Sequence, residues 1–216
     1  MLPDDVHALV KAIERKDLST AAHTWRVVLY ARALAEESGL PHDLVGRITT
    51  GAALHDIGKL DIPDQILQKP GTLDPAEFEI IKTHAARGHA RLLLMGEQDD
   101  IVLDLVRHHH ERWDGSGYPD GLIGEAISPG ARYFSVIDSF DAMTSLRPYR
   151  RETGVKAAEH ALEELESGSG VRYWPTAVEV FARLIRTGRL NWIGEYFNDS
   201  CPVEYTHGRP PERPTT

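Results

Sequence analysis

Residues 44–59 read LVGRITTGAALHDIGK, and this stretch combines a helix signal with a group of polar residues at its end. Apolar residues stand four positions apart, as on one face of a helix, at Leu44, Ile48 and Ala52. His55 and Asp56 follow directly. Adjacent side chains on a helix diverge by about 100°, so we expect these two to flank a site beside the helix. Lys59 follows His55 by four positions, and we expect its ammonium group to reach the same site and neutralise a phosphate oxygen.

Helical spacing of apolar residues continues along most of the chain, and alternation over the length of a strand is absent. Helix starts are marked by Asp74-Pro-Ala-Glu77, which offers an N-cap, a first-turn proline and an acidic third position, and by Ser128-Pro129. The sequence therefore predicts an all-α fold. The expected helices cover residues 4–16, 20–38, 42–57, 75–95, 99–110, 129–145, 153–166 and 175–187.

Size and charge limit the kind of function. The 216 residues fit one sizeable domain, and their apolar content is that of a globular protein. The net charge of -9 argues against a general DNA or RNA binder with a broad basic face. A small anionic substrate is still compatible with this charge, because a bound metal can reverse the local sign.

The N-terminal sequence and the single cysteine restrict location and metal chemistry. The start, MLPDDVHALV, is acidic and has no signal-peptide pattern, and no stretch is as long and apolar as a membrane span. We therefore expect a cytoplasmic protein without a membrane partner. Cys201 cannot form an internal disulfide or a multi-thiolate site, so any metal must be held by nitrogen and oxygen.

Histidines are the most informative residues, because 11 are present and they are unevenly distributed. Imidazoles combined with carboxylates suit Fe, Mn, Zn, Ni or Cu, and a helical bundle can hold such metals in its core. Asp138 lies among apolar residues and needs a metal or a cation to compensate its burial, with Asp141 as the competing candidate and Arg147 as a possible partner for one of them. The cluster comprises His23, His55, Asp56, His84, His108, His109, His110 and Asp138.

The remaining histidines have an ordinary structural interpretation. His89 follows His84 by five positions and so lies off the same helix face. Isolated histidines on helices are usually surface residues or satisfied core residues. We assign that interpretation to His7, His42, His160 and His207. One glycine-rich segment, residues 111–127, is expected to be a structured loop that lines the site.

Taken in order, these motifs resemble the HD-GYP domains, the HD-superfamily phosphodiesterases that hydrolyse cyclic di-GMP. An HD pair alone would be weak, but the ordered set over residues 20–187 is specific. We expect a helical lead-in over 1–19, the HD-GYP domain over 20–187, and a partly disordered C-terminal extension over 188–216. The matching segments are His55-Asp-Ile-Gly-Lys59, Ile62-Pro-Asp-Gln-Ile-Leu-Gln-Lys-Pro-Gly71, His109-His-Glu-Arg-Trp-Asp-Gly-Ser-Gly-Tyr-Pro119, Asp138-Ser-Phe-Asp-Ala142 and Arg147-Pro-Tyr-Arg150.

The resemblance implies a role for each matching residue. Lys59 corresponds to the catalytic lysine of the family, Arg147 and Arg150 to contacts with substrate phosphate, and Tyr118 to a residue facing the substrate or a partner. Gly117-Tyr118-Pro119 resembles the loop that shapes the site and, in some members, docks a diguanylate cyclase (GGDEF) domain. His108 falls outside the motif. The implied metal ligands are His23, His55, Asp56, His84, His109, His110 and Asp138.

Three departures from the family pattern matter. Some members carry a glutamate four residues before the first helical histidine as part of a third metal site, whereas Ser19 stands here, so we expect two iron or manganese ions. Tyr173-Trp-Pro-Thr176 replaces a frequent Phe-Asp-Pro and is expected to alter packing rather than chemistry. Members usually follow a sensory domain, and only about twenty residues precede the match. If the chain is complete, a partner, the substrate level or the metal redox state must regulate it.

The expected reaction is metal-assisted hydrolysis of cyclic di-GMP to linear pGpG, and in some members onward to GMP. One alternative is an HD-superfamily hydrolase that acts on another nucleotide, such as a mixed cyclic GMP-AMP. The other is a non-catalytic signalling scaffold that binds a diguanylate cyclase domain. Scaffolds that have lost activity usually lose ligands, and all seven implied ligands are present here.

Overall fold

The structure is a computed structural model that describes residues 3–17, 21–145 and 155–197. The described residues form helices and loops without any β-strand, which confirms the all-α prediction. No helix among these ranges has the length and apolarity needed to cross a membrane. The α-helices are α1 (Pro3–Lys16), α2 (Ala21–Glu37), α3 (His42–Leu54), α4 (Asp64–Leu67), α5 (Pro75–Leu94), α6 (Asp100–His108), α7 (Pro129–Thr144), α8 (Val155–Ser167), α9 (Pro175–Arg186) and α10 (Asn191–Tyr196), and the short 3-10 helices are η1 (Ile57–Asp61) and η2 (Gly124–Ala126).

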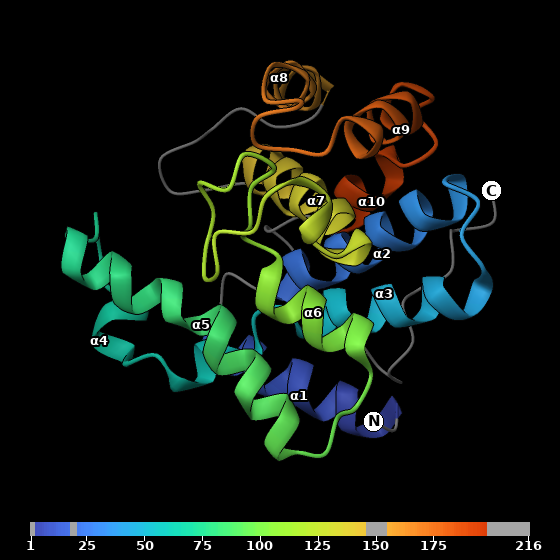
Figure 1. Cartoon of the computed structure of the whole chain (residues 1–216). Coiled ribbons are helices and arrows are strands. Elements are labelled where there is room, and N and C mark those ends of the chain that lie inside the picture. Colours follow the sequence, from blue (N-terminus) through green and yellow to red (C-terminus); the bar gives the residue numbers. More distant parts are fainter. Residues whose placement is uncertain (1–2, 18–20, 146–154, 198–216) are drawn as a thin grey trace.

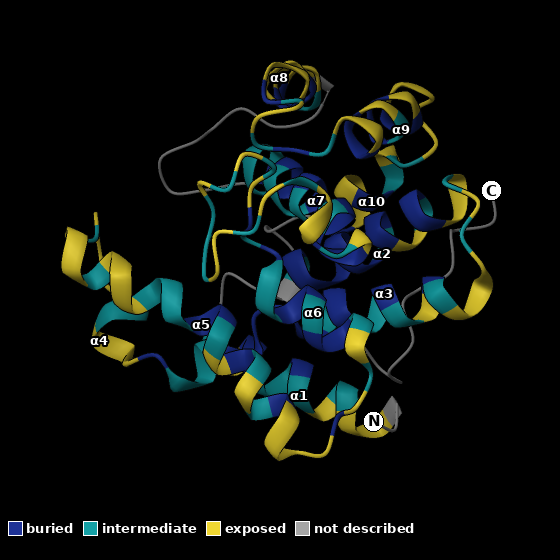
Figure 2. Cartoon of the chain, in the orientation of Figure 1, coloured by how far each residue is buried: buried dark blue, intermediate teal, exposed yellow. Residues whose placement is uncertain are grey.

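The helices surround two apolar clusters. Figure 1 shows α2, α3, α6 and α7 at the centre, with α8 to α10 on one side and α1, α4 and α5 on the other. The larger cluster packs α2, α3 and α7 against α8 and α9 and includes the fully buried Phe134 and Phe181. The smaller one joins α1, α3 and α6 and includes Ile13 and Leu54. Figure 2 shows that burial is concentrated where these central helices meet. His55 directly follows Leu54 and its ring lies 4.8 Å from that of Phe134, so the predicted site lies between the two clusters.

All eight predicted helices are present, but two of them end two or three residues earlier than predicted. The expected helix over 42–57 ends at Leu54, and the one over 99–110 ends at His108. In both cases the chain turns at the predicted ligands, because His55 and Asp56 occupy the junction between α3 and η1, and His109 is the C-cap of α6. Because the helices end there, these side chains lie in turns, where adjacent residues can be directed toward the same site.

Two short α-helices, α4 and α10, were not predicted. Four and six residues respectively give too little periodicity for a sequence pattern to indicate. Helix α10 lies within the predicted C-terminal extension, yet Phe197, which follows it, is fully buried in the larger cluster. The carbonyl of Phe197 also accepts a hydrogen bond from Arg26, at 2.6 Å. This part of the extension therefore contributes to the core.

Helix η1 and α5 approach each other closely at two glycines. A Cβ atom added at Gly58 would lie 1.9 Å from the carbonyl oxygen of His84 and 2.5 Å from the backbone nitrogen of Gly88. Both contacts are with backbone, which cannot rotate away as a side chain can. The absence of a side chain at Gly58 thus allows η1 to lie directly against the turn of α5 that carries His84.

We predict that Gly58→Ala lowers the free energy of unfolding by more than about 3 kcal/mol, because overlap with backbone forces the two helices apart. The measurement is urea denaturation followed by circular dichroism. Gly46→Ala is the matched control, since a Cβ at this position in α3 meets nothing within 4 Å. The control should raise stability by about 0.5–1 kcal/mol, as alanine does in a helix interior. Equal effects of the two substitutions would contradict the close-packing account.

Candidate metal centre

The seven predicted ligands come from five helices and from the turns that end two of them. His23 lies on α2, His84 on α5 and Asp138 on α7. His55 and Asp56 follow α3, while His109 and His110 follow α6. Helix packing brings these positions together although they span more than a hundred residues of sequence. Six of the seven form the two groups described next.

Two triplets of side chains have the proximity that a metal ion needs. In one triplet the ligand atoms of His23, His55 and Asp56 all lie within 4.8 Å of one another, and all three residues are buried. In the second triplet the ligand atoms of His84, His109 and His110 meet the same distance limit. Asp138 stands next to the first triplet, with its Oδ1 3.6 Å from the Nε2 of His23.

Backbone carbonyl groups fix the orientation of three of these imidazole rings. In each ring Nδ1 lies 2.8 or 2.9 Å from the carbonyl oxygen three residues earlier in the chain. A carbonyl oxygen only accepts hydrogen bonds, so Nδ1 must carry a proton, and in the neutral ring Nε2 then presents its lone pair. The pairs are His55 with Ala52, His84 with Ile81, and His109 with Val106.

The resulting lone pairs point at one another. The Nε2 atoms of His84 and His109 are 3.2 Å apart, and those of His23 and His55 are 3.3 Å apart. Two unprotonated nitrogens cannot form a hydrogen bond, so this contact is repulsive unless a cation lies beside both atoms. Converging neutral imidazoles whose other nitrogen is hydrogen-bonded are the usual arrangement of histidine metal ligands. The residues therefore fit a transition-metal ion at each triplet.

The pKa values of the second triplet agree with neutral rings. Burial lowers the pKa of His84, and burial followed by the proximity of His110 holds that of His109 well below its usual range. Burial also lowers the pKa of His110 to about 4. These imidazoles are accordingly unprotonated at neutral pH, which is the form that binds a metal.

Asp56 stands between the two triplets. Its Oδ2 lies 3.2 Å from the Nε2 of His55, and its Oδ1 lies 3.5 Å from the Nε2 of His84. Burial alone would raise the pKa of Asp56, but its nearby positive charge, above all that of Lys59, outweighs burial and holds the pKa well below the usual range. Asp56 is thus an ionised carboxylate with one oxygen directed toward each triplet.

Lys59 is held against this carboxylate. Its Nζ lies 2.8 Å from Oδ2 of Asp56 and 3.0 Å from Oδ2 of Asp17, at the end of α1. Burial would lower the pKa of Lys59, but these two carboxylates raise it. The ammonium group is therefore charged and lies beside the site, as predicted, although its contacts here are with acids of the chain. Asp17 was not singled out from the sequence, because a lone aspartate at a helix end carries no distinctive signal.

Asp141 is fully buried and supports His23 from outside the site. Its Oδ2 lies 2.8 Å from Nδ1 of His23, and Arg26 donates to both carboxylate oxygens, at 2.6 and 3.0 Å. Ser145 donates to the same carboxylate at 2.9 Å. Burial would raise the pKa of Asp141, but the hydrogen bond from His23 and the charge of Arg26 lower it strongly. Asp141 therefore orients His23 through the nitrogen that is not directed at the site.

This arrangement supplies Asp141 with the partner that the sequence left open. A buried cation paired with it is Arg26, three residues after His23 on α2. The sequence offered a signal for this pair, because Arg26 lies one helical turn beyond a predicted ligand and so on the same helix face. Ser19, Arg147, Arg150 and Cys201 lie outside the described residues, and the roles expected of the two arginines remain predictions.

The glycine-rich loop is anchored by Glu111. This carboxylate is buried and accepts hydrogen bonds from the backbone nitrogens of Asp120, Gly121 and Leu122, at 2.7 to 3.1 Å. The loop thereby places Tyr118 with its ring 4.8 Å from that of His110. Glu111 belongs to the matched motif but was given no role from sequence. Its partners are backbone nitrogens nine to eleven residues further along the chain, and no sequence pattern indicates such contacts.

His108 and His89 lie outside the two triplets. His108 directs its Nε2 to Asp120, at 2.9 Å, and Arg107 binds the same carboxylate. His89 belongs to neither triplet, and burial with the charge of Arg107 lowers its pKa. His89 thus agrees with its structural interpretation from sequence, whereas His108 was part of the histidine cluster that the residues suggested and is absent from both triplets.

Together, these features define a helical-bundle protein with two buried groups of side chains that could hold metal ions. Residues 7–177 match the family described as HD domain, so the chain belongs to the HD domain family. The matched segment begins within the predicted lead-in. With the motifs described above, this chain falls in the HD-GYP branch of that family.

Relatives of known name are similar over most of this chain. A cyclic di-GMP phosphodiesterase of Thermotoga maritima is 46% identical over 173 residues, which are 79% of this chain and 46% of that protein. The 3'3'-cGAMP-specific phosphodiesterase 2 of Vibrio cholerae is 36% identical over 180 residues, which are 81% of this chain and 33% of the relative. The chain therefore spans less than half the length of these relatives.

A solved structure shares the fold. The cyclic GMP-AMP specific phosphodiesterase V-cGAP3 of V. cholerae superposes with a TM-score of 0.65 at 19% identity, covering 88% of this chain and 50% of that one. At this identity the likeness supports the fold alone.

We predict that Asp141→Asn weakens metal binding by about 10- to 100-fold, as expected when the group that orients a histidine ligand is replaced. It should also cost about 3–5 kcal/mol of stability, because Arg26 loses its buried counter-charge. The measurements are metal titration of the metal-free protein and urea denaturation. Asp100→Asn is the matched control, since the Asp100 side chain is 81% exposed and its pair with Arg47 lies on the surface. Unchanged metal affinity in Asp141→Asn would refute the orienting role.

Proposed function

We propose that this chain is a metal-dependent phosphodiesterase that hydrolyses cyclic di-GMP to pGpG, with GMP as the further product to be tested, and that it uses two divalent iron or manganese ions. The observation that carries the proposal is the position of Asp56, whose two oxygens face two separate triplets of ligands. The proposed ligand set is His23, His55, Asp56, His84, His109, His110 and Asp138. The name of the Thermotoga relative supports this choice of substrate.

Metal ions bound at the two triplets would supply a hydroxide-like nucleophile near neutral pH and neutralise charge on the phosphate. The side chains of this chain then have defined roles. Asp56 stays ionised and fixes the spacing of the triplets. Lys59 provides a permanent positive charge that can exchange Asp17 for an oxygen of the scissile phosphate. Arg147 and Arg150 are proposed to hold the second phosphate, and Tyr118 to contact the substrate.

Two other functions stay in the proposal as alternatives. The first is hydrolysis of a mixed cyclic GMP-AMP, which the name of the Vibrio relative favours. The second is a signalling scaffold that docks a diguanylate cyclase (GGDEF) domain through Gly117-Tyr118-Pro119. The intact pair of triplets favours catalysis over the scaffold, since a pure docking module has no need of buried, oriented ligands. A cytoplasmic location and the domain limits 20–187 remain part of the proposal.

The test is anaerobic purification with metal analysis, followed by incubation with cyclic di-GMP, 3'3'-cyclic GMP-AMP and cyclic di-AMP. Chromatography then separates pGpG from GMP. Turnover of cyclic di-GMP with the highest kcat/KM of the three supports the proposal. A preference for the mixed nucleotide would replace it with the first alternative. Metal-loaded protein that binds a GGDEF domain but hydrolyses none of the three would establish the scaffold.

We predict that Asp56→Ala reduces bound metal and lowers kcat by at least about a thousandfold, because the shared carboxylate is lost. Far-ultraviolet circular dichroism should show that the protein stays helical. Asp43→Ala provides the control, since Asp43 is an exposed aspartate on α3, the helix that ends just before His55. It should retain the activity and metal content of the parent. Retained turnover in Asp56→Ala would contradict the proposed metal-dependent mechanism.

A further inference from the structure

A cluster of one cation and two aromatic rings extends from the metal centre along α5. The Nζ of Lys82 lies 5.5 Å from the ring centroid of Tyr118 and 5.6 Å from that of Phe78. Phe78 and Lys82 are four residues apart on α5 and so share a helix face. We call Phe78, Lys82 and Tyr118 the α5 platform.

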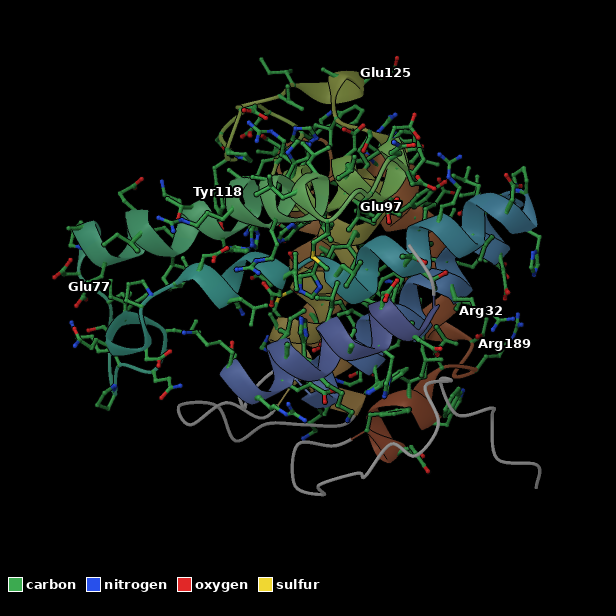
Figure 3. The ribbon with its side chains drawn as sticks, turned by 90° about the horizontal axis from the view of Figure 1, so that it is seen from below. Arg32, Glu77, Glu97, Tyr118, Glu125 and Arg189 are labelled. Carbon is green, nitrogen blue, oxygen red and sulfur yellow. The ribbon has the colours of Figure 1, made fainter. Side chains whose placement is uncertain are left out.

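The platform is continuous with the predicted site. The ring of Tyr118 lies 4.8 Å from that of His110, with only 31° between the planes. His110 in turn belongs to the triplet that contains His84, two residues after Lys82 on the same helix. Figure 3 shows Tyr118 beside the half of α5 that carries Glu77, and Figure 1 shows this half projecting beyond the central helices. A ligand whose phosphate lies at the metal centre can therefore reach outward over the platform.

The platform is accessible to a ligand, and its existing contacts contribute little to stability. Phe78 is 48% exposed, so its ring is open to a ligand. The ion pair of Lys82 is with Glu79, at 2.6 Å, and the Glu79 side chain is 67% exposed. Such an exposed pair contributes little to stability. Lys82 can thus exchange Glu79 for a ligand without unfolding its helix.

These groups match the chemistry of a purine base. Aromatic faces stack on any nucleobase. A lysine ammonium group only donates hydrogen bonds and therefore prefers an edge that carries acceptors. Guanine presents two adjacent acceptors, O6 and N7, whereas adenine presents N7 next to an amino donor. The cation therefore selects guanine, while the rings provide contact area.

We propose that the α5 platform binds a guanine base of the substrate, with Lys82 donating to the O6 and N7 edge and Phe78 and Tyr118 stacking on the base. This inference rests on the proposed function and names the group that determines its base specificity. Lys82 and Phe78 belong to no part of the motifs that indicated the metal centre.

The test compares Lys82→Met with Lys11→Met. Lys11 also pairs with a glutamate one helical turn away, on α1, and its side chain is 32% exposed against 26% for Lys82. Three quantities are measured: KM for cyclic di-GMP, kcat for bis(p-nitrophenyl) phosphate, and inhibition of the latter reaction by GMP and by AMP. Lys82→Met should raise KM and the GMP inhibition constant on the order of tenfold, with AMP inhibition unchanged. The control should alter none of them.

Phe78→Ala tests the stacking part. It should weaken inhibition by GMP and AMP alike by about tenfold, because stacking does not distinguish the bases. Ile80→Ala is its control, since Ile80 is 37% exposed and lies two residues along, on the opposite face of α5.

The outcomes separate this inference from the function on which it rests. A Lys82→Met protein with unchanged GMP inhibition, or with GMP and AMP weakened equally, overturns guanine recognition while leaving the hydrolase assignment intact. A fall in kcat for bis(p-nitrophenyl) phosphate also overturns it, since Lys82 would then act on the metal centre. If the parent protein does not hydrolyse cyclic di-GMP, the proposed function fails, and selective GMP inhibition still decides whether the platform binds guanine.

Discussion

Hydrogen bonds at the outer nitrogen of four histidines determine how the centre of this protein is organised. His55, His84 and His109 each donate Nδ1–H to a backbone carbonyl, and His23 donates to Asp141. In the neutral form, which binds a metal, each of these rings directs the lone pair of Nε2 inward. The Nε2 atoms of the two histidine pairs are then 3.2 and 3.3 Å apart, with their lone pairs facing each other. A cation bound beside both atoms would stabilise this contact. The helix ends, the close glycine contact and the buried ion pairs all serve to maintain this convergence.

The two buried aspartates, Asp141 and Asp56, have different roles, one structural and the other at the site. Asp141 is compensated by Arg26 and Ser145 and lies outside the site, so its charge is used to orient a ring. Asp56 is compensated by Lys59 and faces both triplets, so its charge is available to ligands. Each pairing lowers the pKa of an acid that burial would otherwise neutralise. The two aspartates have similar burial but different functions, because their neighbours differ.

Sequence periodicity and motifs predicted the eight longer helices and identified the residues that converge. Spacing along a helix shows which face a residue occupies, and ordered motifs show which faces carry ligands. Contacts between segments that are distant in the sequence were harder to predict. The pairing of Arg26 with Asp141 joins α2 to α7, and that of Lys59 with Asp17 joins η1 to the end of α1. Lone charged residues have no periodic signal. Arg26 does share a helix face with His23, but only the packed structure reveals the acid with which it pairs. The α5 platform has no sequence signal for the same reason, since it joins Phe78 and Lys82 on α5 to Tyr118 in the glycine-rich loop.

X-ray absorption spectroscopy of the anaerobically iron-loaded protein is the most direct test of the proposed role of Asp56 between two metal sites. We expect two ions per chain and a metal–metal scattering distance of about 3.5–4 Å, as in other two-metal hydrolytic sites. We also expect a first coordination shell made only of nitrogen and oxygen. A single ion per chain, or two ions without a metal–metal vector, would contradict the bridging role of Asp56.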